Sequence, residues 1–215
     1  MTKKDKAIEI LKILREKFGH PKCALDYNSP FELLVAVILS AQCTDVRVNI
    51  VTKTLFKVAN TPEDFANMPL LEIEELVRST GFFRNKAKNI KLCSEQLLEK
   101  YNGDIPKSME ELTKLAGVGR KTANVVRGEI WGLADGITVD THVRRLSNLI
   151  GFVNIEDPIK IEKELMKFVP KKDWIDFSHL LILQGRDICI ARRPKCDICE
   201  IKEFCNYGNK KNFNS

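Results

Sequence analysis

The stretch LAGVGRKTA, residues 115–123, joins two segments of helical character. A helix is expected from Ser108 to about Leu115 and a second from near Arg120, which makes the stretch the turn of a helix-hairpin-helix. Its glycines allow a sharp turn and a close approach of the backbone to phosphate, and amides at a helix start favour an anion. A tight turn that only packs two helices is the alternative. The residues expected at a nucleic-acid phosphate are Gly117, Val118, Gly119 and Arg120.

Lys121 follows this turn, and its amine has two possible uses. A free lysine amine is almost fully protonated at pH 7 and is then a poor nucleophile. Burial, the neighbouring Arg120 cation and the positive end of a helix would all favour the neutral amine, which can attack carbon. From the residues alone, Lys121 is equally consistent with a phosphate contact and with a nucleophile.

Asp140 stands at the start of another expected helix, in the segment ITVDTHVRR, residues 137–145. A carboxylate there can take a proton from an amine or stabilise a cation that develops at a sugar carbon. It can also cap the helix by accepting from the amides of His142 or Val143. The local sequence favours the cap over catalysis.

Four cysteines follow one another as C-x6-C-x2-C-x5-C, at Cys189, Cys196, Cys199 and Cys205. This spacing offers four thiolates to one metal centre, either an iron–sulfur cluster or a zinc site. The other cysteines are scattered singly in apolar contexts, where we expect core residues. Seven cysteines distributed in this way do not indicate a disulfide framework.

Composition and apolar spacing predict an all-α protein. Of the 215 residues, 44% are hydrophobic, and the apolar ones recur at three- and four-residue steps, as in Ile8, Leu11, Leu14 and Phe18. Glycine and proline breaks predict helices of about ten to fifteen residues. No apolar run reaches the length of a membrane span, and the N-terminal apolar residues are interspersed with charges, unlike a secretion signal. We therefore expect a cytoplasmic protein without membrane contact.

The net charge of +6 suits a polyanionic partner, and the basic residues are concentrated in two places. Arg84, Lys86, Lys88 and Lys91 form a run without an acidic residue. A second group surrounds the start of the cysteine loop and consists of Arg186, Arg192, Arg193 and Lys195. Both groups are typical of phosphate contacts, and a solvated surface is the alternative.

Taken together, these segments resemble the endonuclease III family from end to end. LSAQCTDVRVN (residues 39–49), LAGVGRKTANVV (115–126), VDTHVRR (139–145) and the cysteine spacing all stand in the family's order. The resemblance implies a base-excision DNA glycosylase that removes oxidised pyrimidines and has β-elimination AP lyase activity. It further implies a monomer that acts on damaged or abasic double-stranded DNA, associated with the nucleoid in the cytoplasm.

The resemblance also implies a bilobal helical fold with DNA in the groove between two domains. A six-helix barrel with the hairpin would span residues 22–133, and residues 1–21 and 134–215 would form the domain that carries a [4Fe-4S] cluster. Lys121 would be the nucleophile that forms a Schiff base, and Asp140 would assist it. The cluster ligands would be Cys189, Cys196, Cys199 and Cys205.

An extruded nucleotide leaves a gap in the duplex that side chains must fill. The resemblance assigns this role to Gln42 and Phe82, and implies further DNA contacts at His142, Arg145, Arg192 and Lys195. Two positions depart from the family pattern. Phe82 replaces a leucine, which leaves the opposite-base preference open, and Ala116 replaces a proline in the hairpin turn.

Two other functions remain open on the sequence. An adenine-specific, monofunctional mismatch glycosylase shares the hairpin, the aspartate and the cluster, but such enzymes lack a lysine at the position of Lys121. A DNA-binding module would use the hairpin and the cluster only for attachment or redox sensing.

Overall fold

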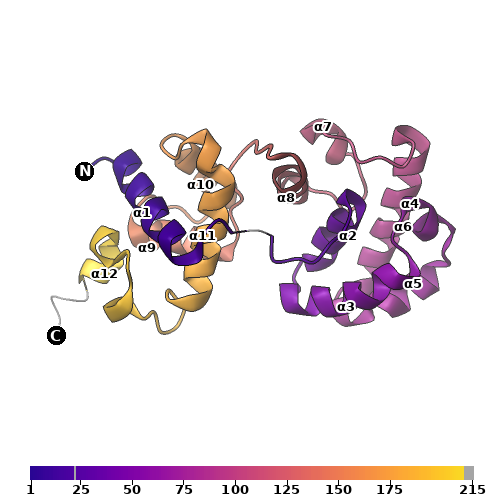
Figure 1. Cartoon of the computed structure of the whole chain (residues 1–215), viewed down its shortest axis with the longest axis horizontal. Helices are drawn as coiled ribbons and strands as arrows, with labels where there is room; N and C mark the ends of the chain where they lie inside the picture. The colour runs from indigo at the N-terminus through magenta and orange to yellow at the C-terminus, as the bar shows by residue number, and fades with distance from the viewer. Residues whose placement is uncertain (22, 211–215) are drawn as a thin grey trace. The chain divides into compact units, whose positions relative to one another are not determined.

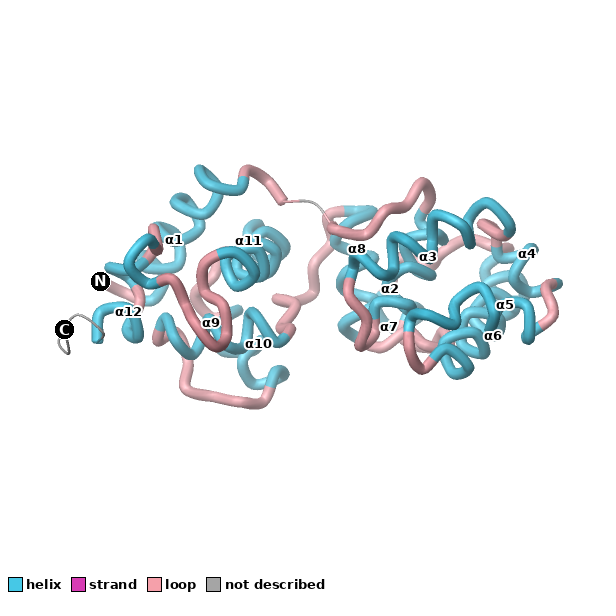
Figure 2. Tube along the Cα trace, turned by 90° about the horizontal axis from the view of Figure 1, so that it is seen from below, coloured by secondary structure: helices cyan, strands magenta, loops and turns pink. Residues whose placement is uncertain are grey.

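The structure, a computed structural model, describes residues 1–21 and 23–210. All regular elements in these ranges are helices, and Figure 2 shows them joined by loops with no strand in the described chain. The prediction of an all-α fold is confirmed. A search of the described residues finds no helix with the length and apolarity that a membrane crossing needs.

The chain divides into two compact units, each with its own apolar core. Unit 1 combines the described residues of Met1–Lys22 and Ala134–Ser215, and unit 2 is Cys23–Leu133. Lys22, the first residue of the predicted barrel, lies outside the described residues.

Unit 2 (Figure 1) contains a helix that is almost entirely apolar, with Glu32 as its charged residue. This helix, α2 (Pro30–Ser40), begins after the Ser29 cap, and its side chains from 31 to 39 are all buried. A helix without a polar face is stable only inside a core. The other elements of unit 2 are α3 (Asp45–Val58), α4 (Pro62–Asn67), α5 (Leu70–Val77), the 3-10 turn η1 (Arg78–Thr80), α6 (Phe83–Tyr101), α7 (Met109–Leu112) and α8 (Arg120–Trp131). Of these, α3, α6 and α8 pack against α2.

Several helices of unit 2 are shorter than the ten to fifteen residues we predicted. α4 has 6 residues, α5 has 8 and α7 has 4, whereas α6 has 19. Pro62 is the first residue of α4 and Pro69 is the N-cap of α5, and both mark helix starts because proline is excluded from a helix interior. Such short helices owe their stability to packing, and here α4 and α5 both contact the long α6.

Unit 1 joins the N-terminal helix to the C-terminal part of the chain (Figure 1). Its α-helices are α1 (Lys3–Phe18), α9 (Thr141–Ile150), α10 (Pro158–Met166), α11 (Trp174–Asp187) and α12 (Asn206–Lys210). α1 buries Ala7, Ile10, Leu11 and Leu14, whereas Ile8 is 41% exposed. The predicted apolar face was therefore wrong at Ile8, because the small Ala7 lies against the core in its place.

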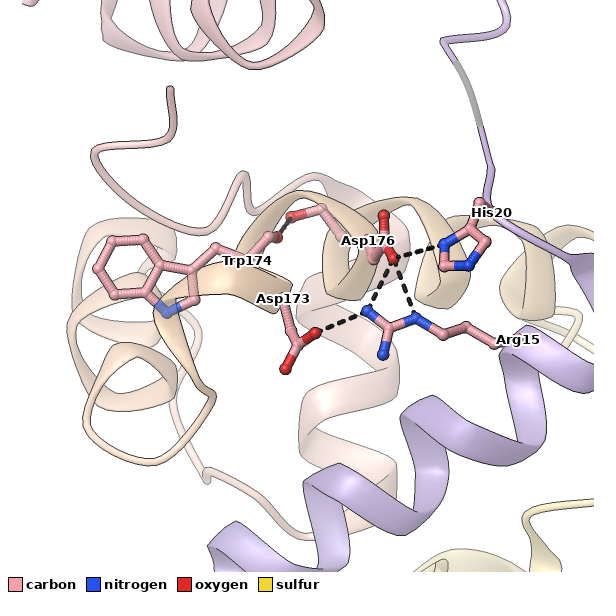
Figure 3. Close-up of polar contacts among 6 residues, drawn as sticks. Arg15, His20, Asp173, Trp174 and Asp176 are labelled. Atoms are coloured by element: carbon pink, nitrogen blue, oxygen red, sulfur yellow. Dashed lines mark hydrogen bonds and ion pairs between the residues drawn. The ribbon is translucent and has the colours of Figure 1, made fainter. Parts of the chain in front are cut away.

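A cluster of charged side chains fastens α1 to α11 (Figure 3). Arg15 Nη2 lies 2.7 Å from Asp173 Oδ1 and 2.7 Å from Asp176 Oδ2, and Arg15 Nε donates to the same Asp176 oxygen at 3.0 Å. His20 Nδ1 is 3.3 Å from that oxygen. Burial by itself lowers the pKa of Arg15, but the hydrogen bonds and charges of the two carboxylates raise it by more, so the net shift is upward. The guanidinium thus stays charged between two helices that are distant in sequence.

Candidate functional site

The hairpin turn contains two glycines, and the structure requires a glycine at only one of these positions. Gly117 has φ +74°, and a Cβ built on it would lie 2.9 Å from Asn89 Cβ, so only glycine fits there. Gly119 has φ −84°, and a Cβ on it would meet no atom within 4 Å. Val118 is 5% exposed and anchors the turn in the core of unit 2. The structure therefore requires Gly117 for folding and leaves Gly119 open to an approaching ligand.

Ala116, which replaces the family's proline, makes a hydrogen bond that proline could not make. Its amide donates to Gln96 Oε1 on α6 at 2.8 Å. Proline lacks this N–H. The departure in the turn is thus compensated by a tether from α6, a partner that the sequence did not reveal.

The start of α8 presents Lys121 and backbone amides. Gly119 is the N-cap and has no side chain that could bond the first-turn amides. Such amides favour an anion, together with the positive end of the helix. Lys121 is exposed, so the burial that we expected to favour a neutral amine is absent in this structure.

Asp140, in unit 1, is the N-cap of α9. Its Oδ1 accepts from the amides of His142 at 2.9 Å and Val143 at 2.8 Å, so the predicted cap is confirmed. Both bonds use Oδ1, and Oδ2 takes no part in the cap. A carboxylate held in this way can cap a helix and still present an oxygen to a reacting group.

Gln42 and Phe82 lie in two loops of unit 2 and share an unusual backbone conformation. Gln42 has φ 52° and Phe82 has φ 48°, which is the left-handed region that residues with a Cβ seldom adopt. Both side chains are exposed, and Phe82 is 69% exposed. Phe82 is therefore not a core aromatic. Strained, exposed positions of this kind often mark ligand contacts.

The four clustered cysteines all line one cavity of unit 1, whose wall also includes Leu149, Ile188 and Pro194. Each of the four thiols is half-buried. Burial raises the pKa of Cys189 and of Cys199, so a metal centre would have to displace protons from them. Four thiol donors around one largely apolar cavity fit an iron–sulfur cluster.

One backbone N–H group and one side-chain N–H group point at these sulfurs. The Gly208 amide is 3.4 Å from Cys205 Sγ, and Gln184 Nε2 is 3.5 Å from Cys199 Sγ. Donors at sulfur suit thiolates better than thiols. Gln184 is fully buried on α11, and no spacing rule in the sequence connects it with the cysteines.

The other predicted DNA contacts of unit 1 divide into exposed and engaged side chains. Arg192 and Lys195 are exposed. Arg145 Nη2, by contrast, donates to the carbonyls of Gly185 at 3.1 Å and Cys189 at 2.6 Å. Burial lowers the pKa of His142; Arg145 and Arg186 act in the same direction, and Asp140 opposes them. The hydrogen bonds of Arg145 to Gly185 and Cys189 therefore give this side chain a structural role inside unit 1.

The basic run from Arg84 to Lys91 contains two lysines that are neither phosphate contacts nor solvated surface. Lys86 is 5% exposed and donates to the carbonyls of Leu39 and Thr80. Lys91 donates to the carbonyls of Ala66 and Met68. For these two residues both of our sequence-based interpretations were wrong. The available signal was the position of Lys86 beside Ala87 and Ile90 on the apolar face of α6.

Two family models match the chain. One describes the HhH-GPD superfamily of base excision DNA repair proteins and matches residues 35–171. The other describes the iron-sulfur binding domain of endonuclease III and matches residues 189–205, which begin and end at clustered cysteines. The fold and the hairpin thus define a helix-hairpin-helix protein of base-excision repair, and the prediction of an iron–sulfur cluster in place of zinc is confirmed.

Comparison with individual proteins identifies the family within this class. An endonuclease III of Synechocystis is 50% identical over 204 residues, which cover 95% of this chain and 93% of that protein. The solved structure of a non-covalent endonuclease III–DNA complex matches with a TM-score of 0.91 and 44% identity, covering 99% of this chain and 100% of that one. A trapped endonuclease III–DNA covalent intermediate matches with a TM-score of 0.90 and 45% identity, covering 98% and 99%. The chain belongs to the endonuclease III family.

Proposed function

We propose that this chain is a bifunctional DNA glycosylase that removes oxidised pyrimidines from double-stranded DNA and cleaves the resulting abasic site by β-elimination. The observation that carries the proposal is Lys121 at the uncapped start of α8, directly after the hairpin turn, in a member of the endonuclease III family. A relative has been trapped as a covalent intermediate with DNA, which supports an amine nucleophile.

The chemistry uses two side chains. The neutral amine of Lys121 attacks the sugar C1′, a bond forms between nitrogen and C1′, and the glycosidic bond breaks with its electron pair going to the base, which takes up a proton. Asp140 accepts the proton lost by the amine and stabilises the cationic sugar. The C1′–O4′ bond then breaks, O4′ takes up a proton, and a Schiff base remains at C1′. Loss of a 2′ proton forms a C2′–C3′ double bond while the 3′ phosphate leaves with the electron pair of the C3′–O bond, and water then hydrolyses the Schiff base and frees Lys121.

The nucleotide must leave the stack before this attack, and Gln42 and Phe82 fill the space that it leaves. Both side chains are exposed, and both residues have a left-handed backbone conformation; these two observations support this role. An aromatic ring can stack on the bases that flank the gap, as apolar wedges do in other DNA-bending proteins.

Cys189, Cys196, Cys199 and Cys205 hold the cluster in this proposal. The cluster supplies thiolate–iron bonds that cross-link the loop, and the loop presents Arg192 and Lys195 to phosphates. The reaction needs no redox change. We further propose that the protein works as a monomer on chromosomal DNA.

The decisive experiment is borohydride trapping on duplex DNA that contains thymine glycol. The wild-type protein should give a covalent adduct, and Lys121→Ala should give none. Lys114→Ala is the matched control, because Lys114 is an exposed lysine that pairs with Glu110 at 2.7 Å outside the turn. Base release without an adduct would favour a monofunctional glycosylase. Tight binding with thymine glycol and abasic sites left intact would favour a binding module.

A further inference from the structure

Lys86 is a buried lysine whose amine reaches two separate loops of unit 2. The residue is 5% exposed, and Nζ donates to the carbonyl of Leu39 at 2.8 Å and to that of Thr80 at 2.7 Å. Leu39 and Thr80 are themselves almost fully buried. A single amine thus joins two chain segments that are far apart in sequence.

Both carbonyls lie where a cation is favoured. Leu39 belongs to the last turn of α2, and Thr80 ends the 3-10 turn η1. The last carbonyls of a helix lack partners within it and carry partial negative charge. Burial lowers the pKa of Lys86, and Cys43 acts against that shift. Burying an ammonium is costly without partners, so this site is built for two strong acceptors.

Each of these carbonyls lies two or three residues before one of the two strained residues. Gln42 follows Leu39, and Phe82 follows Thr80, within a few residues. Among the described residues, the non-glycine positions with positive φ are Gln42, Phe82 and Asn102. Two of these three positions therefore lie in loops whose preceding residues, Leu39 and Thr80, both accept hydrogen bonds from the Lys86 amine. A left-handed backbone at a residue with a Cβ persists only where the surroundings hold it.

We propose that Lys86 is a positioning residue that holds the Gln42 and Phe82 loops in fixed relation, so that both side chains enter the duplex together when a nucleotide is extruded. This inference rests on the proposed function, because it assigns a common purpose to the two loops. Lys86 itself touches neither DNA nor the reacting atoms. Its contribution is to pre-organise the two side chains, which reduces what must be ordered on binding.

The test variant is Lys86→Met, which keeps a long apolar side chain and removes the charge and both hydrogen bonds. The matched control is Lys91→Met. Lys91 lies on the same helix α6 and also donates to two carbonyls, those of Ala66 and Met68, but these belong to the end of α4 and the residue after it. Both variants lose two hydrogen bonds to carbonyls, and Lys91→Met also loses an ion pair with Glu95 at 3.7 Å, so the control removes at least as many contacts. Only Lys86→Met is expected to release the Gln42 and Phe82 loops.

Two measurements separate the loops from the chemistry. The first is borohydride trapping on a single-stranded abasic oligonucleotide, which has no opposite strand and no gap to fill. The second is binding to a duplex with a tetrahydrofuran abasic analogue, with 2-aminopurine opposite it to report unstacking. We expect Lys86→Met to trap single strands at the wild-type rate, but to bind the duplex at least about tenfold more weakly and to lose the fluorescence rise. Lys91→Met should keep all three properties.

Equal duplex binding and equal 2-aminopurine signals in Lys86→Met and Lys91→Met would overturn the inference and leave the proposed function intact. Failure of the wild-type protein to trap any abasic DNA would instead overturn the proposed function. If Lys86→Met does not fold by circular dichroism, the milder pair Lys86→Gln and Lys91→Gln carries the same comparison, since glutamine retains a neutral donor. The expected order of duplex affinities is the same.

Discussion

Arg145 donates a 2.6 Å hydrogen bond to the backbone carbonyl of Cys189, the first of the four clustered cysteines. The helix that Asp140 caps is thereby joined to the start of the cysteine loop. The same nitrogen also donates to Gly185 on α11 at 3.1 Å. Removal of this guanidinium is therefore expected to destabilise the capped helix and the cysteine loop together.

Arg145→Ala should loosen the cysteine loop. Hydrogen bonds from a charged donor contribute about 1.5–3 kcal/mol, so we expect an unfolding free energy lower by about 2–3 kcal/mol and faster iron release to a chelator. Iron content per chain and urea unfolding measure the two effects. Arg144→Ala is the control, because Arg144 forms an exposed pair with Glu156 at 3.3 Å. Equal iron release from the two variants would contradict the assignment.

Asp140→Asn should separate the helix cap from the catalytic role. Asparagine caps helices about as well as aspartate, so stability should change by no more than about 0.5 kcal/mol. The single-turnover rate of base release should fall by orders of magnitude, because an amide accepts no proton from the amine. Asp140→Ala should lose both the activity and about 1 kcal/mol of stability. A fully active Asp140→Asn enzyme would leave Asp140 as a cap alone.

The two hairpin glycines should respond differently to alanine. Gly117→Ala forces a left-handed residue against Asn89, so we expect a loss of about 2–4 kcal/mol of stability. Gly119→Ala meets open space and should leave stability within about 0.5 kcal/mol of the wild type. Its methyl group would instead obstruct a phosphate and weaken duplex binding. Thermal unfolding and a binding titration distinguish the two effects.

His142 should make the protein less stable in mild acid. Its pKa is lowered by burial and by Arg145 and Arg186, so the unfolded chain binds a proton more readily than the folded one. The stabilisation is fully present above the unfolded histidine value of about 6.5 and is lost as the pH falls through the lower folded value. Urea midpoints between pH 7.5 and 5.5 should fall less steeply in His142→Gln. Parallel curves would show that other groups cause the slope.

Arg15→Met should weaken unit 1 without touching the hairpin. The buried Asp173 would lose its 2.7 Å partner, and we expect a cost of about 2–3 kcal/mol. Lys12→Met, on the exposed side of α1, is the control. Hydrogen exchange should accelerate in α1 and α11 and remain unchanged in α8. Faster exchange in both units alike would argue against a local role for Arg15.

The elements that the sequence predicted well are those encoded by neighbouring residues. The hairpin turn, the start of α8 near Arg120 and the Asp140 cap all depend on residues within one or two turns of each other. Lys86 could not be interpreted in this way, because its acceptor at Leu39 is 47 residues distant. Ala116 likewise bonds Gln96 across 20 residues. Composition alone made Lys86 and Lys91 appear to be phosphate ligands, although tertiary contacts use both amines inside unit 2.

Unit 1 is assembled from both ends of the polypeptide, since Arg15 and Asp176 are 161 residues apart. During translation, α1 leaves the ribosome long before α11, so Ile10 and Leu14 lack this packing partner until α11 has been made. The contiguous unit 2 can complete its core in that interval. Insertion of the metal centre therefore becomes a late event in biogenesis, and a nascent chain stalled before α11 would expose the apolar face of α1 to chaperones.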